Sequence, residues 1–384
     1  MSRLPTSVRL AAPAVTAALL ALSACTSDLP VVEEAGSVVV TVPGGPPVGD
    51  LAWPAGVAVT PDGGSTVLLG GPRGDATGLT LVSAAGEVTA TLAVPGFAAV
   101  YAVAPTATSI AVVGWLPGDD DSPGSLALGS VDPATGGAGP VTLLPTPVGV
   151  DRYLTQAVAL GDGRLVVAVD RISDQPPVLL LVDPATAAVT AGAEVDLGGV
   201  RTSVVDVADL AVTPDGSRVA VGISTYSDRR SGALLATAGT DLQPEGPAID
   251  LAPDEPTAWV ETVDVADDGT AYTLAAVGVR LTAQLLAVQP GATSAAVLGD
   301  PDEDLLDGES VDLAVTDGAA WVLAELPDGG GTALTRVDLA DGEPSDPHVF
   351  CDGAAGRLAL QEDGGLLVTG RCDGEAQLWE LDPR

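Results

Sequence analysis

The chain has 384 residues, with 52 acidic and 15 basic side chains and a formal net charge of −37 at pH 7. This charge argues against nucleic acid as a partner, because phosphate binding requires clustered positive charge. It favours a cationic partner or divalent ions and repels an anionic surface, or it serves only to keep the protein soluble.

The first 24 residues have the features of a cleavable secretory signal. Arg3 and Arg9 give the start a positive charge, and residues 10–24 form an apolar run that is too short to span a bilayer comfortably. The run ends in Leu22-Ser-Ala-Cys25, which resembles the bacterial lipobox. The resemblance implies that residues 1–24 are removed and that Cys25 carries lipid. The alternative is an ordinary signal peptide followed by a chance cysteine.

In this interpretation residues 25–35 are a lipidated tether, and residues 36–384 are the folded domain. Several acyl chains on one residue suffice for stable anchoring, so we expect the protein at the extracytoplasmic face of the cell membrane. Removal of the signal takes away two arginines and no acid, which leaves 13 basic and 52 acidic side chains and a charge of −39.

Two cysteines remain once lipidation has used the first. Cys351 and Cys372 are an even pair in an exported protein, so a disulfide between them is expected. Zinc is a poor alternative, because the single histidine, His348, leaves such a site short of ligands. No metal site is therefore predicted from these residues.

One pattern recurs along the chain: a short apolar strand, a turn that ends in Asp-Gly, and a second apolar strand. Residues 57–63 and 210–216 are clear copies, and residues 101–107 are a degenerate one. Asp-Gly between β-branched runs predicts a hairpin, because glycine adopts positive φ without steric cost. The seven copies are separated by 44 to 56 residues, and their turns end at positions 63, 107, 163, 216, 269, 318 and 364.

A third strand follows each hairpin, and a fourth segment rich in Val, Thr and Leu follows most of them. Four strands per repeat, with hardly any helical pattern, predict an all-β, seven-bladed β-propeller with four-stranded blades. The last repeat ends after its third strand, residues 376–381, whereas a lone strand, residues 37–42, precedes the first. We expect this N-terminal strand to complete the last blade and close the ring, which also pairs an exposed edge.

Residues 53–63 and 210–220 resemble the inner-strand motifs of WD-repeat-like propellers of bacterial envelopes, the YVTN, NHL and TolB-type families. The similarity spans nearly the whole mature chain. These motifs are turns that build a fold shared by proteins of many functions, so the resemblance implies architecture and leaves activity open.

Catalytic constellations are sparse. His348 lies between Pro347 and Val349, where we expect a loop before the last blade rather than a general base. No Gly-x-Ser-x-Gly elbow is present. Propeller lactonases and quinone-dependent dehydrogenases generally rely on more histidine, lysine or asparagine than this chain contains. Paired carboxylates remain an alternative, although no pair stands out among the 52 acids.

Calcium is the one cofactor for which the sequence offers candidates. Residues 300–304 alternate acids as a calcium loop does, but Leu305 and Val311 stand where an EF-hand has glycine and its closing glutamate. Residues 119–121 are three aspartates, which a solvated loop explains most simply. We therefore expect no cofactor.

Aromatic residues recur four places before the inner strands. Trp53, Phe97, Tyr153 and Trp259 hold this position in four repeats, in a chain that is only 3% aromatic. The other three repeats have Asp206, Glu309 and Ala354 there. Loops that lead into inner strands line one face of a propeller, so these rings form a candidate binding face. The alternative is that they wedge between blades as core residues.

These observations favour a monomeric, membrane-anchored, extracytoplasmic scaffold that binds a protein, peptide or envelope component without catalysis. The rival is an exported propeller enzyme, a carboxylate-dependent hydrolase or lyase. The rival predicts closely spaced acids with raised pKa values at the channel, whereas scattered, solvated acids would weaken it.

Overall fold

A computed structural model gives the structure of most of the chain that follows residue 31. The residues that it describes are 32–39, 53–59, 64–70, 76–93, 97, 99–106, 108–116, 124–135, 137–145, 150–171, 175–200, 202–228, 230–300, 304–306, 309–316, 318–327, 331–351, 353–361, 364–372 and 375–383.

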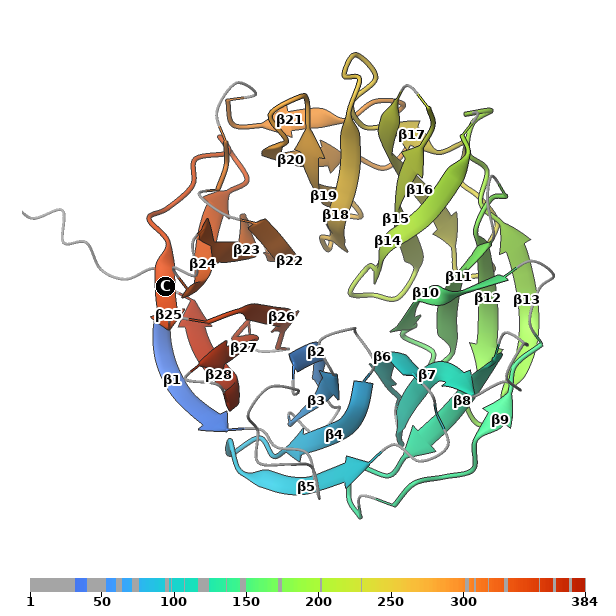
Figure 1. Ribbon diagram of the computed structural model, residues 1–384, viewed down its shortest axis with the longest axis vertical. Coiled ribbons are helices and arrows are strands. Elements are labelled where there is room, and N and C mark those ends of the chain that lie inside the picture. The colour runs from blue at the N-terminus through green and yellow to red at the C-terminus, as the bar shows by residue number, and fades with distance from the viewer. Residues whose placement is uncertain are drawn as a thin grey trace, which may run out of the picture.

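The described strands form seven four-stranded antiparallel sheets around a central axis (Figure 1). Each sheet is one blade. Within blades 1 to 6 the strands follow one another in chain order, and the first strand lies nearest the axis. The described residues contain no α-helix. The predicted class, an all-β propeller with four-stranded blades, is confirmed.

The first three blades have these strands: β2 (Trp53–Val59), β3 (Ser65–Gly70), β4 (Ala76–Val82) and β5 (Val88–Ala93); β6 (Ala99–Pro105), β7 (Ile110–Leu116), β8 (Ser125–Val131) and β9 (Thr142–Leu143); β10 (Val150–Ala159), β11 (Leu165–Arg171), β12 (Val178–Asp183) and β13 (Ala188–Glu194).

The next three blades have these strands: β14 (Val204–Val212), β15 (Arg218–Tyr226), β16 (Ser231–Gly239) and β17 (Ile249–Asp250); β18 (Ala258–Val265), β19 (Ala271–Val277), β20 (Thr282–Val288) and β21 (Ala296–Leu298); β22 (Glu309–Thr316), β23 (Ala319–Leu326), β24 (Gly331–Asp338) and β25 (His348–Cys351).

Blade 7 joins the two ends of the chain. Its inner strands are β26 (Ala355–Leu360), β27 (Leu366–Cys372) and β28 (Glu375–Pro383), and its outermost strand is β1 (Val32–Val39). Figure 1 shows β1, in blue, beside the red strands of this blade. The predicted closure by an N-terminal strand is confirmed. The strand occupies residues 32–39 rather than 37–42, so four residues that we assigned to the tether belong to the blade.

The two faces of the ring are distinguished by the innermost strands. We call the face at which these strands begin the N-face, and the face at which they end the C-face. The Asp-Gly turns lie on the C-face. Five of their glycines, at positions 163, 216, 269, 318 and 364, have φ between 68° and 90°, as the hairpin prediction requires. The turns at 63 and 107 lie outside the described residues.

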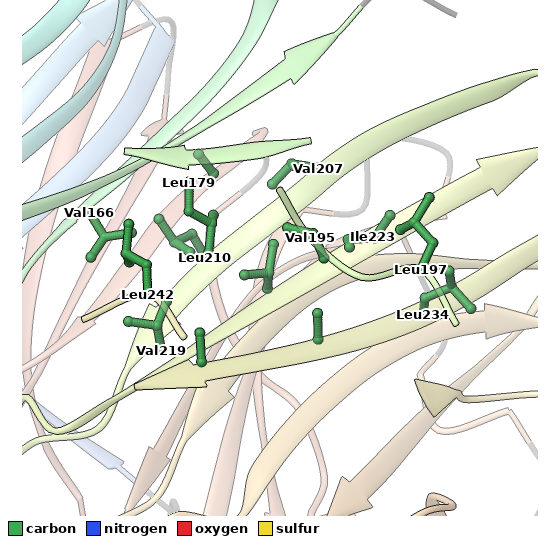
Figure 2. Packing of buried hydrophobic residues seen from close by; sticks show 14 of the residues in the cluster. Val166, Leu179, Val195, Leu197, Val207, Leu210, Val219, Ile223, Leu234 and Leu242 are labelled. Atoms are coloured by element: carbon green, nitrogen blue, oxygen red, sulfur yellow. The ribbon is translucent and has the colours of Figure 1, made fainter. Parts of the chain in front are cut away.

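The hydrophobic core lies between neighbouring blades. Between blades 3 and 4, for example, Val166 and Leu179 pack with Leu210, Val219 and other aliphatic side chains (Figure 2). The middle strands are covered on both sides, so eight of the nine residues of β15 are buried. Burial on both sides explains why these strands read as continuous apolar runs in the sequence.

The turns of adjacent blades touch on the C-face, which yields a first prediction. A Cβ added to Gly216 would lie 2.3 Å from the backbone nitrogen of Gly161 in the preceding blade, and the φ of Gly216 is 68°. Gly163 has a φ of 82°, and a Cβ there meets nothing within 4 Å. Gly163→Ala therefore costs about 1 kcal/mol of strain, whereas Gly216→Ala costs about 3 kcal/mol because the clash adds to it.

The two midpoints of urea unfolding for the mature domain measure this difference. Equal losses in the two variants would show that blades 3 and 4 do not touch at these turns.

Candidate functional site

A cavity of about 460 Å³ occupies the centre of the ring. It is lined by the innermost strands of blades 2 to 7 and by Val57 of blade 1. On the side of blades 2 and 3 its wall consists mainly of small apolar residues of β6 and β10. On the side of blades 4 to 7 it is charged. The charged lining residues are Asp209, Glu261, Asp264, Asp312 and Arg357.

Bulges in the inner strands help to position this charged wall. The strand register shifts between Val207 and Asp209 in blade 4, and between Ser310 and Asp312 in blade 6. Blade 5 has the equivalent shift just before Thr262. A bulge re-aims the side chain that follows it, and here each shift comes directly before a polar residue of the channel.

Each of three aspartates holds two neighbouring blades together through backbone hydrogen bonds. Asp209 accepts the N–H of Leu210 in its own strand at 2.8 Å and that of Val263 in blade 5 at 3.0 Å. Asp312 repeats this arrangement one blade pair later. It accepts the N–H of Leu313 at 3.0 Å and that of Leu358 in blade 7 at 2.8 Å.

Asp264 makes the same kind of bridge between blades 5 and 6. It accepts the N–H of Val265 in its own strand at 2.8 Å and that of Val315 in blade 6 at 2.7 Å. The three aspartates therefore link blades 4, 5, 6 and 7 in succession. Each backbone donor that they satisfy would otherwise face the channel, where a buried donor without a partner is costly.

The three carboxyls also interact with one another. The hydroxyl of Thr262 lies 2.7 Å from Oδ2 of Asp209 and 3.4 Å from Oδ1 of Asp312, so it donates toward both. We found no carboxylate pair in the sequence that stood out, and the structure corrects this. Asp209 and Asp312 directly precede the first residue of their inner-strand repeat, and Asp264 directly follows it. This position in the repeat is the sequence signal that would have revealed them.

Burial and mutual repulsion raise the pKa values of this cluster. Burial raises the pKa of Asp264 to about 7, and the charges of Asp209 and Asp312 add to the rise. Burial raises the pKa of Asp312 to about 6, although the positive charge of Arg357 opposes the shift. The pKa of Asp209 is raised by burial as well. The cluster therefore titrates near neutral pH.

Arg357 is the single cation among the residues that line the cavity. Its Nη1 donates to the carbonyl of Val311 in blade 6 at 2.9 Å, so its side chain crosses from blade 7 to the neighbouring blade. Its backbone N–H donates to the hydroxyl of Thr369 at 2.7 Å. Arg357 therefore both links blades and offsets part of the negative charge of the channel.

Metal ligands do not converge in the described part of the chain. No group of three or more His, Cys, Asp or Glu side chains there is placed to hold an ion. Of the two calcium candidates, Asp304 caps backbone instead, accepting the N–H of Ala283 at 3.0 Å. Residues 119–121 and 301–303 lie outside the described residues.

His348 is the first residue of β25, the outermost strand of blade 6, rather than part of a loop. Its ring meets that of Phe350 edge-on, with centroids 4.8 Å apart, and Phe350 in turn lies 5.1 Å from Trp379 of blade 7. The outermost strand is remote from the channel, so His348 does not contribute to the acidic cluster.

The four aromatic positions of the candidate binding face lie at or near the N-face starts of inner strands. Phe97 is half-buried and packs against the core between blades 1 and 2, as the wedge alternative predicts. Trp259 is half-buried in β18. The side chains of Trp53 and Tyr153 lie outside what the structure describes, and the binding role of these positions stays a prediction.

A cluster of exposed apolar side chains, which the sequence analysis did not identify, lies on the N-face of blades 4 and 5. Its members are Val200, Val204, Tyr226, Val279 and Leu281, with exposed fractions of 38%, 40%, 37%, 86% and 41%. We call these five residues the N-face apolar cluster. Turn and strand-end residues carry little periodic signal, which is why the repeat pattern missed them.

Backbone hydrogen bonds join the turns of blades 4 and 5 that carry the N-face apolar cluster. Val204 and Tyr226 are partners across β14 and β15. The N–H of Ser231 donates to the carbonyl of Pro256, and the N–H of Gly278 donates to that of Thr257. The turns of both blades are thus bonded to the segment that leads into β18.

Cys372 is 4% exposed and takes part in a disulfide. Strand registers place it at the N-face end of β27, and they place Cys351 at the N-face end of β25. The side chain of Cys351 is outside what the structure describes, so its pairing with Cys372 stays a prediction. The signal segment and Cys25 lie outside the described residues too. In the described ranges no helix is long and apolar enough to cross a membrane.

Neither a protein-family model nor a curated protein matches the chain. Solved structures do match its fold. Hydrazine synthase of Kuenenia stuttgartiensis is 14% identical, over 88% of this chain and 98% of that one, with a TM-score of 0.61. Virginiamycin B lyase of Staphylococcus aureus is 10% identical, over 90% and 98%, with a TM-score of 0.54. The WD40 propeller domain of Doa1 is 11% identical, over 93% and 98%, with a TM-score of 0.55.

Identities this low establish the fold alone. The chain is a β-propeller, and the similar structures include both a lyase and a WD40 domain. Its function must be argued from its own residues.

The raised pKa of Asp264 predicts a contribution to stability that decreases as the pH rises. Asp264 holds its proton up to about pH 7 in the folded protein, whereas its ordinary value is 3.8. The folded state therefore binds more protons between these values. The contribution of Asp264 to stability is therefore fully present below about pH 4 and is lost as the pH rises through about 7.

Asp264→Asn removes this titration. The stability advantage of the wild type over the variant should shrink by a few kcal/mol from pH 4 to pH 7, as measured by urea unfolding at several pH values. Asp254→Asn, which removes an exposed carboxylate, is the control and should leave the pH profile unchanged. Parallel profiles for wild type and Asp264→Asn would contradict the raised pKa.

Proposed function

We propose that the protein is a membrane-anchored, extracytoplasmic propeller scaffold that binds a protein or peptide through its N-face. The observation that carries this proposal is the N-face apolar cluster. It gathers five exposed aliphatic or aromatic side chains on adjacent blades, half of the ten large hydrophobic residues that are exposed in the described part of the chain. Exposed apolar side chains that gather on one surface mark interaction sites.

The N-face also carries the recurring aromatic positions. One of them, Trp259, is the second residue of β18 in blade 5. A half-buried tryptophan next to exposed aliphatic side chains is a common anchor of protein interfaces. A neighbouring cavity of about 250 Å³ extends the surface beside Val200. Arg230 lines this cavity and is held by Asp250, to which its Nη2 donates at 2.8 Å.

The acidic channel supports a scaffold because its carboxylates have a structural use. Asp209, Asp264 and Asp312 each accept a backbone N–H from the next blade, so removing any of them weakens the ring. Networks that hold a structure together perturb pKa values without any catalytic role.

Location at the membrane rests on the sequence. The signal-like start and the lipobox resemblance at Cys25 support an anchored protein outside the cytoplasm. The net charge of the mature chain favours a partner with basic groups.

Substitutions within the N-face apolar cluster should weaken partner binding without unfolding the protein. Val279→Ser combined with Tyr226→Ser removes two exposed apolar side chains of the cluster, and capture of the partner from envelope extract by the immobilised mature domain should fall about tenfold. Quantitative mass spectrometry of the captured proteins measures this loss.

The matched control is Val297→Ser combined with Val349→Ser. These residues are 41% and 47% exposed but lie on the outer strands β21 and β25. The control should capture as the wild type does. Equal capture by both double variants, with unchanged melting temperatures, would remove the N-face from the proposal.

A second candidate function, a carboxylate-dependent hydrolase or lyase, is favoured by the acidic cluster itself. Two carboxyls with pKa values of about 7 and about 6 line a cavity of about 460 Å³, which is the arrangement that this rival predicts. One group protonated and one ionised near neutral pH is what general acid and base catalysis requires.

An enzyme of this kind should turn over one of a panel of chromogenic esters, glycosides and lactones. Its rate should fall about a hundredfold or more in Asp264→Asn and in Asp312→Asn, and not in Asp254→Asn. The pH profile of the wild type should be bell-shaped near pH 6 to 7. Absence of turnover across the panel, or turnover that survives both substitutions, would rule out this candidate.

A further inference from the structure

The pairing of β1 with β28 fixes the side of the ring from which the N-terminal segment departs. Val32 pairs with Pro383 and Val39 pairs with Gln377. β28 ends on the C-face, because Leu381 pairs with Leu366, the first residue of β27 after its Asp-Gly turn. The chain that precedes Val32 therefore leaves the propeller at the C-face, at the outer edge of blade 7.

Seven residue steps of chain connect Cys25 to Val32. They reach at most about 25 Å when fully extended. The eight residues of β1, which run from one face of the blade toward the other, span about 26 Å. The segment is therefore about as long as the blade is high.

We propose that the anchored propeller turns its C-face toward the membrane and presents its N-face, with the N-face apolar cluster, away from the bilayer. This inference rests on the proposed anchoring through Cys25. In this orientation Val32, where the chain enters β1, lies on the side of the ring that points to the membrane, within about 25 Å of Cys25.

The opposite orientation, with the N-face on the membrane, requires the segment before Val32 to span the whole height of blade 7. Val279 and Leu281 flank Arg280 at the tip of the β19–β20 turn, and such a tip would suit insertion among lipid headgroups. Lipid at Cys25 would then have to lie at the level of the N-face. The segment before Val32 would need to turn back and run fully extended over the whole height of blade 7, with no slack.

Ionised carboxylates lie on the C-face, which points toward the membrane in the proposed orientation. Asp132, Asp183 and Asp215 stand on the C-face, and hydrogen bonds from neighbouring side chains lower the pKa of each. These carboxylates are ionised at neutral pH and are repelled by anionic lipid headgroups. The propeller therefore stands off from the bilayer at the reach of its anchor rather than resting on the headgroups.

Two fluorophore positions on one blade test the orientation. Gln289→Cys places a label on the C-face turn after β20, and Val279→Cys places one on the N-face turn before it; both residues are exposed. The full lipidated protein is reconstituted into vesicles of phosphatidylethanolamine and phosphatidylglycerol with a quencher attached to the headgroups. The Gln289→Cys label should be quenched about threefold more than the Val279→Cys label, because the height of a blade separates them.

Flotation of the vesicles separates the two ways in which the proposal can fail. If the wild type floats and Cys25→Ala does not, the anchoring is established, and equal or reversed quenching overturns the orientation alone. If the wild type does not float with the vesicles, the anchoring through Cys25 is wrong, and the orientation falls with it.

Discussion

The backbone pairing of β1 with β28 is the contact on which the ring depends. A propeller whose last blade lacks its outer strand presents an unpaired edge, and β1 covers this edge with main-chain hydrogen bonds over its length. The rest of the closure is side-chain packing: Leu367 and Leu378 of blade 7 contact Val82 of blade 1. Because every blade is buried against two neighbours, closing the ring completes the core of the first and the last blade at once.

The channel shows how one arrangement can serve the fold and resemble a reaction centre. Aspartates bridge inner strands because the backbone donors at the channel wall need acceptors, and the same burial that makes the bridges useful raises the pKa values of Asp264 and Asp312. A perturbed carboxyl is therefore not by itself a sign of catalysis. Substitution distinguishes the structural role from the catalytic one. Turnover that survives the loss of a bridging aspartate shows that the role of this aspartate is structural.

Much of the fold was predictable from the sequence, because each blade of a propeller repeats the same short sequence pattern. Asp-Gly turns, β-branched runs and their spacing gave the blades, and the missing fourth strand of the last repeat, set against a lone N-terminal strand, gave the closure. The exact start of β1 was not predictable, since Val32 to Ala35 are as polar as a tether. The acidic cluster was missed because its members lie about 50 positions apart in the chain, and only an alignment of the repeats brings Asp209, Asp264 and Asp312 to neighbouring positions. Phe97 looked like part of a face because periodicity does not tell inward from outward.

The direction of β1 has a mechanical consequence for a protein held by its N-terminal end. Tension from the anchor would act along the axis of β1, while its hydrogen bonds to β28 lie perpendicular to that axis. Such a load shears all the bonds of the strand together instead of peeling them apart singly. In a protein anchored through its N-terminal end, β1 would therefore resist a pull along its axis better than a pull across it.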